Sequence, residues 1–297
     1  MPTNRTTNFL RELLVRQLTT WLPAALQRSR RATVALAWAG ADEGGGAEAA
    51  LRVIAGHADQ VRGRRVTVLV LADGAADLPA RLGPVEAELP AEVTVHLLPG
   101  VPDRLPVAVK AAGAAGSPLF SFVDLPGAAT PELLTATSNG RAGEVLLHAG
   151  SGTRDALIAA GFPLVAEVVP VLPDNEAAGV IAFGSRSDRS LEAVRDALWA
   201  IGADLDVRYR DPADPAGAPV DVAGDPNPEA LARELLAELR RGGSRPVTEL
   251  RRHTLTTTVY RAADANRALT ALLEAGDVRR EREAGRLAGD EIITVRG

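Results

Sequence analysis

The chain has 297 residues, of which 46% are hydrophobic and 24% charged, as in ordinary soluble proteins long enough for one large domain and a small one. It contains no cysteine, which excludes disulfides, cysteine-ligated zinc, iron–sulfur clusters and thiol nucleophiles. The net charge of −5 argues against a broadly basic nucleic-acid binder, and the four histidines show no metal-ligand spacing, so no metal site is predicted.

The amino-terminal residues 1–30 carry a helical pattern. Leu10, Leu14 and Leu18 recur at helical spacing, which predicts an amphipathic helix that is kinked or restarted at Pro23. The segment has no apolar core of the signal-peptide type, and no run of about 18 apolar residues occurs in the sequence. We therefore expect a cytoplasmic protein with no membrane association.

Residues 31–210 alternate between strand and helix patterns. The apolar runs that predict strands are 33–39, 65–73, 92–98, 119–124 and 143–150. The segments between and after them that predict helices are 47–61, 77–88, 103–115, 131–139 and 153–161. This alternation predicts an α/β fold with a mostly parallel sheet and helices on both faces.

The regular alternation of strand and helix patterns ends after residue 161. Strands are predicted at 163–172 and 179–185, then a helix at 188–202 and an edge strand at 204–210. A five-strand parallel unit closed by an antiparallel tail is the plan of Rossmann-like methyltransferases, which is the architecture we expect.

The last third of the chain reads as a linker followed by a small domain. Residues 211–228 are rich in proline and poor in large hydrophobic residues, which is typical of a linker. Residues 229–297 contain three helical patterns and then a segment whose central Gly-Arg-Leu-Ala-Gly predicts a hairpin. Three helices followed by a hairpin predict a winged-helix domain.

Candidate ligand residues lie where the predicted strands end, because open α/β sheets bind ligands outside the carboxyl ends of their strands. Gly40 and the run Gly44, Gly45 and Gly46 follow the first strand, where a backbone without side chains can approach a nucleoside. A connector with three glycines also reads as a simple turn, since the motif is not the GxGxxG of dinucleotide-binding folds.

Three further residues stand at strand ends. Asp73 ends the second strand, where an acidic side chain can accept hydrogen bonds from ribose hydroxyls, or it is a turn residue. Asp124 ends the fourth strand and points a carboxylate into the predicted crevice, or it caps the following loop. His148 ends the fifth strand and could face the same crevice or have a structural role.

Several segments together resemble one known family, the three-Cys-motif partner proteins. The similar segments are TWLPAAL (20–26), LAWAGADEGGG (36–46), FSFVDLPG (120–127), GVIAFGSRSDRSLEAVRDALWAIG (179–202) and the end of the chain from Val247 to Val278. Their shared order covers most of the chain. The resemblance implies a methyltransferase fold with a carboxy-terminal winged helix, S-adenosylmethionine as cofactor, and a partner protein bearing three cysteines.

The sequence departs from that family at two loops. No aspartate precedes the Ala-Gly of the first loop, and the family's Asp-Pro-Phe-Gly becomes Asp124-Leu125-Pro126-Gly127. The lost aromatic removes the face on which a flipped base would stack. Two hypotheses therefore stand, an S-adenosylmethionine-dependent methyltransferase-like protein with Asp124 near the methyl acceptor, and a catalytically degenerate scaffold.

The predicted winged helix offers a surface for DNA, RNA or a protein partner. The arginines that could contact phosphates are Arg261, Arg267, Arg279, Arg280, Arg282 and Arg286. Acidic residues such as Glu274 and Glu281 alternate with them, which is also typical of a solvated hairpin or a protein contact.

Overall fold

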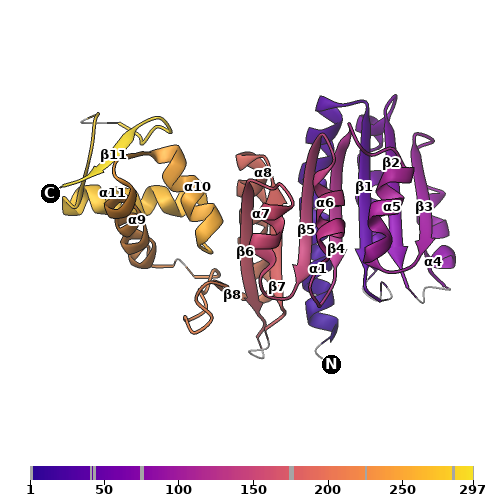
Figure 1. The fold of residues 1–297 in the computed structure, drawn as a ribbon, viewed down its shortest axis with the longest axis horizontal. Coiled ribbons are helices and arrows are strands. Elements are labelled where there is room, and N and C mark those ends of the chain that lie inside the picture. Colours follow the sequence, from indigo (N-terminus) through magenta and orange to yellow (C-terminus); the bar gives the residue numbers. More distant parts are fainter. Residues whose placement is uncertain are drawn as a thin grey trace.

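The computed structural model describes residues 3–40, 42, 45–73, 77–173, 177–224, 226–282 and 285–296. Over these ranges the chain has a mixed α/β fold with a large, mostly parallel central sheet of eight strands and a separate sheet of three strands. Figure 1 shows the two parts next to each other, with the carboxy-terminal elements in orange and yellow beyond β6 and β8. None of the helices described is long and apolar enough to cross a membrane.

The central sheet has the order β3-β2-β1-β4-β5-β7-β6-β8. Its strands are β1 (Arg31–Trp38), β2 (Arg65–Ala72), β3 (Val93–Pro99), β4 (Pro118–Asp124), β5 (Ala142–Ala149), β6 (Leu164–Val171), β7 (Val180–Ser185) and β8 (Arg208–Arg210). Strands β1 to β5 are parallel, β7 is antiparallel to both β5 and β6, and β8 is antiparallel to β6. The predicted parallel unit and its antiparallel tail are confirmed.

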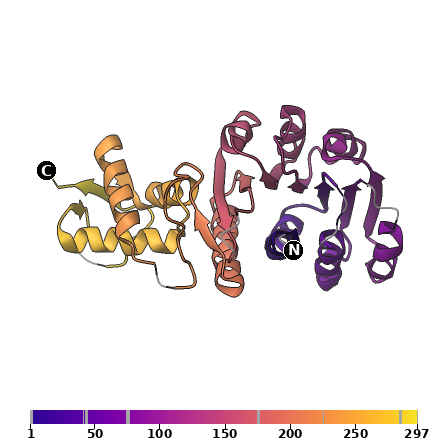
Figure 2. The ribbon, with the colours of Figure 1, turned by 90° about the horizontal axis from the view of Figure 1, so that it is seen from below.

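Helices cover both faces of this sheet, as Figure 2 shows in a view along the strands. One layer contains α1 (Thr3–Arg28), α2 (Gly46–Gly56), α4 (Leu78–Glu86) and α8 (Asp188–Leu205), and the other contains α5 (Leu105–Ala111), α6 (Pro131–Ser138) and α7 (Thr153–Ala159). The short α3 (Ala58–Val61) and the 3-10 turn η1 (Pro102–Arg104) lie in connections. Each layer buries its own apolar cluster against the sheet.

The first helix is continuous through its proline. Pro23 lies inside α1, so the helix does not restart there. Trp21 packs against Phe120 of β4 with ring centroids 5.5 Å apart, and Leu18 and Leu22 are fully buried. Burial of this face against the sheet offsets the hydrogen bond that proline removes from a helix.

The carboxy-terminal unit, residues 229–296, has a core of its own. It contains α9 (Glu229–Gly242), β9 (Arg245–Pro246), α10 (Val247–Thr257), α11 (Ala262–Ala275), β10 (Val278–Arg280) and β11 (Ile292–Val295). The sheet order is β10-β11-β9, with both pairs antiparallel, so the predicted hairpin is confirmed. Leu235, Leu269 and Ile293 are fully buried in the cluster that joins these elements.

Specific contacts join this unit to α8. The buried Arg195 donates from Nη2 to the Leu255 carbonyl at 2.7 Å, and burial lowers the pKa of Arg195 to about 10. Trp199 donates from Nε1 to the Val259 carbonyl at 2.9 Å, and the Arg261 guanidinium lies 3.9 Å from the Trp199 ring centroid. These buried polar contacts fix α10 and the start of α11 against the central sheet.

The proline-rich segment 211–228 packs in part on the central sheet. Val220 pairs with Tyr209 of β8 as an isolated bridge, and Val222 is buried. Gly202 of α8 lies beneath the side chains of Val222 and Tyr209, where an added Cβ would clash with Val222 and stand 2.9 Å from Tyr209. This part of the segment is thus held by the sheet.

Candidate functional site

The carboxyl ends of β1, β2, β4 and β5 form one edge, which we call the carboxyl edge. Backbone hydrogen bonds join the neighbouring strand ends there, from Asp73 N to Gly40 O at 3.2 Å and from Leu125 N to His148 O at 2.9 Å. A third runs from Ala39 N to Asp124 O at 2.9 Å. The predicted residues Gly40, Asp73, Asp124 and His148 therefore lie along the same edge. Gly44 lies outside the described residues.

A buried aspartate occupies the amino terminus of α2 at this edge. The side chain of Asp42 accepts hydrogen bonds from Gly46 N at 2.8 Å and from Ala47 N at 2.9 Å, and its residue is 2% exposed. Both amides belong to the first turn of the helix, where backbone N–H groups lack helical partners and favour an anion. The protein thus supplies its own carboxylate at a position that could otherwise bind an anionic ligand.

Burial has the largest effect on the pKa of Asp42 and raises it. The two amide hydrogen bonds and the positive charge of Arg81 lower this pKa, and the negative charge of Asp124 raises it. Arg81 of α4 also donates to the Asp42 carbonyl at 3.0 Å. Two carboxylates and one guanidinium therefore lie close together at the ends of β1 and β4.

The described glycines of the first loop have different roles. Gly45 has φ +67, a left-handed conformation that favours glycine. Gly46 is buried, and an added Cβ would stand 2.8 Å from the Trp38 ring, so its lack of a side chain serves packing within the protein. Gly40 is exposed, and no atom lies within 4 Å of its added Cβ. Of the three, Gly40 is best placed to let a ligand approach its backbone.

The side chain of Asp124 is engaged with His148. Its Oδ1 lies 2.7 Å from Nδ1 of the imidazole, and Nε2 of the same ring lies 2.6 Å from the Ala178 carbonyl. A carbonyl oxygen can only accept, so Nε2 is the donor in the second contact. Gly179 packs closely against the His148 ring, because an added Cβ at this glycine would stand 2.7 Å from Nε2.

This arrangement decides what the carboxyl edge can do chemically. Asp124 and His148 form a closely contacting pair at the carboxyl edge, with side chains 23% and 10% exposed. Asp73 is exposed at the end of β2. The edge therefore presents an exposed acidic side chain beside an exposed glycine, with a partly shielded Asp–His pair on the next two strands, β4 and β5.

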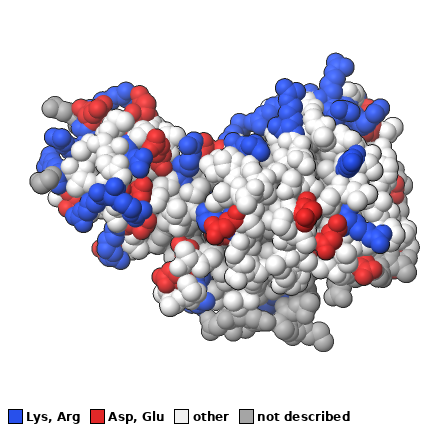
Figure 3. All heavy atoms as spheres, viewed as in Figure 1, with Lys and Arg blue, Asp and Glu red and all other residues white. Residues whose placement is uncertain are grey.

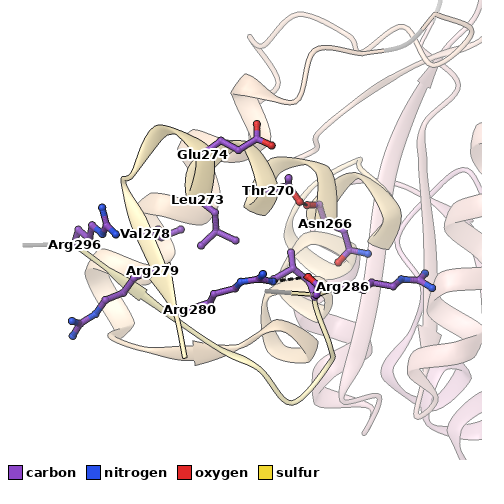
Figure 4. Close-up of a pocket in the computed structure, with 11 residues that line it drawn as sticks. Asn266, Thr270, Leu273, Glu274, Val278, Arg279, Arg280, Arg286 and Arg296 are labelled. Atoms are coloured by element: carbon purple, nitrogen blue, oxygen red, sulfur yellow. Dashed lines mark hydrogen bonds between the residues drawn. The ribbon is translucent and has the colours of Figure 1, made fainter. Parts of the chain in front are cut away.

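A hollow lies in the carboxy-terminal unit, between α11 and the β10–β11 hairpin. It has a volume of about 610 Å³ and is lined on the helix side by Asn266, Thr270 and Glu274. Figure 4 shows Arg280 lying across this groove, whereas Arg279 and Arg296 extend outward from it. The groove thus combines one inward arginine with an acidic residue.

Most of the arginines predicted to contact phosphates have partners inside the protein. Arg261 pairs with Asp264 at 3.0 Å and stacks on Trp199, and Arg267 lies 3.7 Å from the same carboxylate. Arg280 pairs with the buried Glu291 at 3.7 Å and donates to the Gly285 carbonyl at 2.9 Å.

Of the remaining hairpin arginines, one forms an ion pair and two are exposed. Arg282 pairs with Asp290 at 3.0 Å. Arg279 and Arg286 are exposed, and neither has an ion pair with any residue in the described ranges.

Two residues of the site, Asp42 and Arg81, were not predicted from the sequence. For Asp42 a signal exists, since an aspartate four residues before a helix start can reach its first amides. Arg81 reaches the Asp42 carbonyl from α4, and no local pattern marks this contact.

Within the described ranges, no group of three or more histidine, aspartate or glutamate side chains is arranged to hold a metal ion. Comparison with family models and with curated proteins found no family model and no curated relative that matches this chain.

Proposed function

We propose that this protein is an S-adenosylmethionine-binding protein of the Rossmann-like methyltransferase type, with the cofactor at the carboxyl edge. The observation that carries the proposal is the strand order β3-β2-β1-β4-β5-β7-β6, with β7 antiparallel between β5 and β6. This order is typical of Rossmann-like methyltransferases. Since a fold alone does not imply a function, the proposal also depends on the residues at the strand ends.

In this proposal, different residues of the carboxyl edge contact different parts of the cofactor. Asp73 accepts hydrogen bonds from the ribose hydroxyls, and the bare backbone at Gly40 leaves room for the nucleoside. The methyl acceptor approaches near Asp124. Because methyl transfer is an in-line displacement, the protein acts mainly by positioning the two reactants, and few catalytic side chains are required.

Asp42 constrains the pose of the ligand. Its carboxylate already occupies the first two amides of α2, so the amino-acid carboxylate of the cofactor binds elsewhere on the edge. Arg81 lies beside this turn, where its Nη1 donates to the Asp42 carbonyl at 3.0 Å, and supplies a cationic side chain for that carboxylate.

The second candidate is a scaffold without catalysis. It is favoured by the contact between Asp124 and His148, which engages the proposed catalytic carboxylate with a neighbouring side chain. The element order α9-β9-α10-α11-β10-β11 is typical of winged helices, and in this reading that unit binds a three-Cys-motif protein or a nucleic acid.

Calorimetric titration with S-adenosylmethionine and with its demethylated product tests the proposal. We expect micromolar binding, lost on Asp73→Ala and retained in Asp59→Ala, which removes an exposed carboxylate from the opposite edge of the sheet. Absence of heat at millimolar ligand in the unaltered protein would rule out the cofactor proposal and leave the scaffold.

A further inference from the structure

The amino-terminal ends of β1, β2 and β3 leave part of one sheet face uncovered. Helix α5 is short and packs on β1 and β2, where Leu69 and Leu71 are buried beneath it. Thr94 and His96, on the same face of the edge strand β3, are exposed. The result is a groove of about 800 Å³ at the edge opposite the carboxyl edge.

We call this hollow the amino-edge groove and define it by its principal side chains. These are Arg30, Arg31, Arg64, Arg65, Thr94 and His96. In Figure 3 basic side chains gather along the top of the molecule, over the amino-terminal ends of the central strands.

Two arginines of the groove are direct neighbours. Arg31 and Arg65 are register partners on the adjacent parallel strands β1 and β2, so their backbones lie about 4.8 Å apart. Like charges on neighbouring strand positions repel each other. An anion bound between the two guanidinium groups would remove this repulsion.

The arginines of the groove are not neutralised by the protein. Arg30, Arg31, Arg64 and Arg65 form no ion pair with any carboxylate of the described ranges. The acidic residue of the lining, Glu92, accepts a hydrogen bond from Gly63 N at 3.0 Å, and that bond lowers its pKa. Four arginines against this one ionised carboxylate leave the groove positively charged, although the chain as a whole carries −5.

The chemistry of the lining indicates the kind of partner. Guanidinium groups bind phosphate through paired N–H donors, and the hydroxyls of Thr67 and Thr94 and the imidazole of His96 add further donors. The lining holds no Phe, Tyr, Trp, Leu, Ile or Met. Protein interfaces depend on aromatic or large aliphatic anchors at their centre, so an acidic protein is the poorer fit.

We propose that the amino-edge groove binds the sugar–phosphate backbone of a nucleic acid, without reading its bases. Phosphate contacts position a nucleic acid but carry no sequence information. The groove offers no large aromatic side chain on which a base could stack. A nucleic acid bound here lies on the side of the sheet opposite the proposed cofactor edge.

The test is fluorescence anisotropy with short labelled single-stranded DNA, single-stranded RNA and duplex DNA, using the full chain. Arg31→Gln/Arg65→Gln should weaken binding about tenfold and reduce the slope of log affinity against log salt by about 2. Two charge-matched variants serve as controls, Arg233→Gln/Arg240→Gln on α9 and Arg279→Gln/Arg286→Gln on the hairpin. Arg30→Gln/Arg64→Gln provides a second groove variant if the first fails to fold by circular dichroism.

Each other outcome would overturn the inference. No binding by the unaltered protein at low salt excludes a nucleic-acid partner, and a loss confined to the hairpin variant places binding in the carboxy-terminal unit. Equal small losses in all variants indicate general charge attraction. Equally tight binding of polyglutamate, lost in the groove variants, identifies an acidic polypeptide as the partner instead.

Discussion

The carboxylate of Asp124 and the imidazole of His148 are joined by a 2.7 Å contact between Oδ1 and Nδ1, and the two residues are register partners on β4 and β5. The contact orients a partly shielded carboxylate at the end of β4. It also links the sheet to the loop before β7, because the same ring contacts the Ala178 carbonyl. The pair is therefore a structural element of the carboxyl edge, whatever ligand binds beside it.

A double-mutant cycle measures this contact. Asp124→Ala and His148→Ala should each lower the free energy of unfolding by about 1–3 kcal/mol, because each leaves a shielded polar group without its partner. The double variant should lose less than the sum of the two, by about 1 kcal/mol. Urea unfolding gives these values, with the exposed Asp59→Ala as a control. Strict additivity would show that the contact contributes nothing to stability.

Alanine substitutions at two glycines with similar backbone conformations distinguish the cost of backbone strain from the cost of a steric clash. Gly179 and Gly63 have φ +79 and +73, but an added Cβ meets His148 Nε2 at 2.7 Å in the first case and no atom within 4 Å in the second. Gly63→Ala should cost about 1–2 kcal/mol from backbone conformation alone. Gly179→Ala should cost about 1–3 kcal/mol more, since the held ring cannot move aside. Equal losses of thermal stability in the two variants would contradict this account of Gly179.

A buried glutamate should make the protein less stable as the pH rises. Glu144 of β5 is 5% exposed. It accepts from Ser190 at 2.6 Å and Ser185 at 3.2 Å, yet its Oε2 has no hydrogen-bond partner within the described part of the chain. Burial raises its pKa above the ordinary value of 4.5. Between that value and the folded-state pKa, the folded protein binds more protons than the unfolded one, so stability falls with increasing pH.

The substitution Glu144→Gln should remove this dependence. We expect a gain on the order of 1 kcal/mol at neutral pH, which disappears below 4.5, where the native side chain is neutral in both states. Thermal unfolding followed by circular dichroism across this range measures it. The exposed Glu86→Gln is the matched control. A constant difference at all pH values would mean that the effect of Glu144 is one of packing and not of charge.

The contact between α8 and the carboxy-terminal unit can be weakened at one residue. Trp199→Phe removes the donor to the Val259 carbonyl and reduces the ring surface beneath Arg261. We expect a loss of about 1–3 kcal/mol and faster amide exchange between α10 and α11. Trp38→Phe, in the packing of Phe122 near the carboxyl edge, should leave exchange there unchanged. Unchanged exchange in the Trp199 variant would show that other contacts hold the two parts together.

The order of the elements was predictable because each depends on a local pattern. The continuous apolar runs of β1, β2, β4 and β5 identify strands buried on both faces. Pro23 was misleading, since its helix-breaking effect is local whereas the burial that keeps α1 continuous comes from β4. The capping role of Asp42 has a local signal, its position four residues before the helix start, but its burial there depends on tertiary packing.

The hairpin arginines show the same limit. Their number and spacing are visible in the sequence, but their partners are set by how β10 lies against β11 and the turn between them. Arg280 faces Glu291 and Arg282 faces Asp290 across this hairpin. The charge available to a ligand is therefore smaller than a count of arginines indicates.

The sequence by itself determined the α/β alternation, the parallel sheet and the set of residues that end its strands, because periodicity and strand-end position are local properties of the chain. Only the tertiary structure decided which of those residues meet, that Asp124 is engaged by His148 and that the first turn of α2 is occupied by Asp42. It also decided that Arg31 and Arg65, far apart in the sequence, stand side by side. The physical reason is that hydrogen bonds and charge interactions depend on distances of a few ångströms, which the packing of distant segments sets.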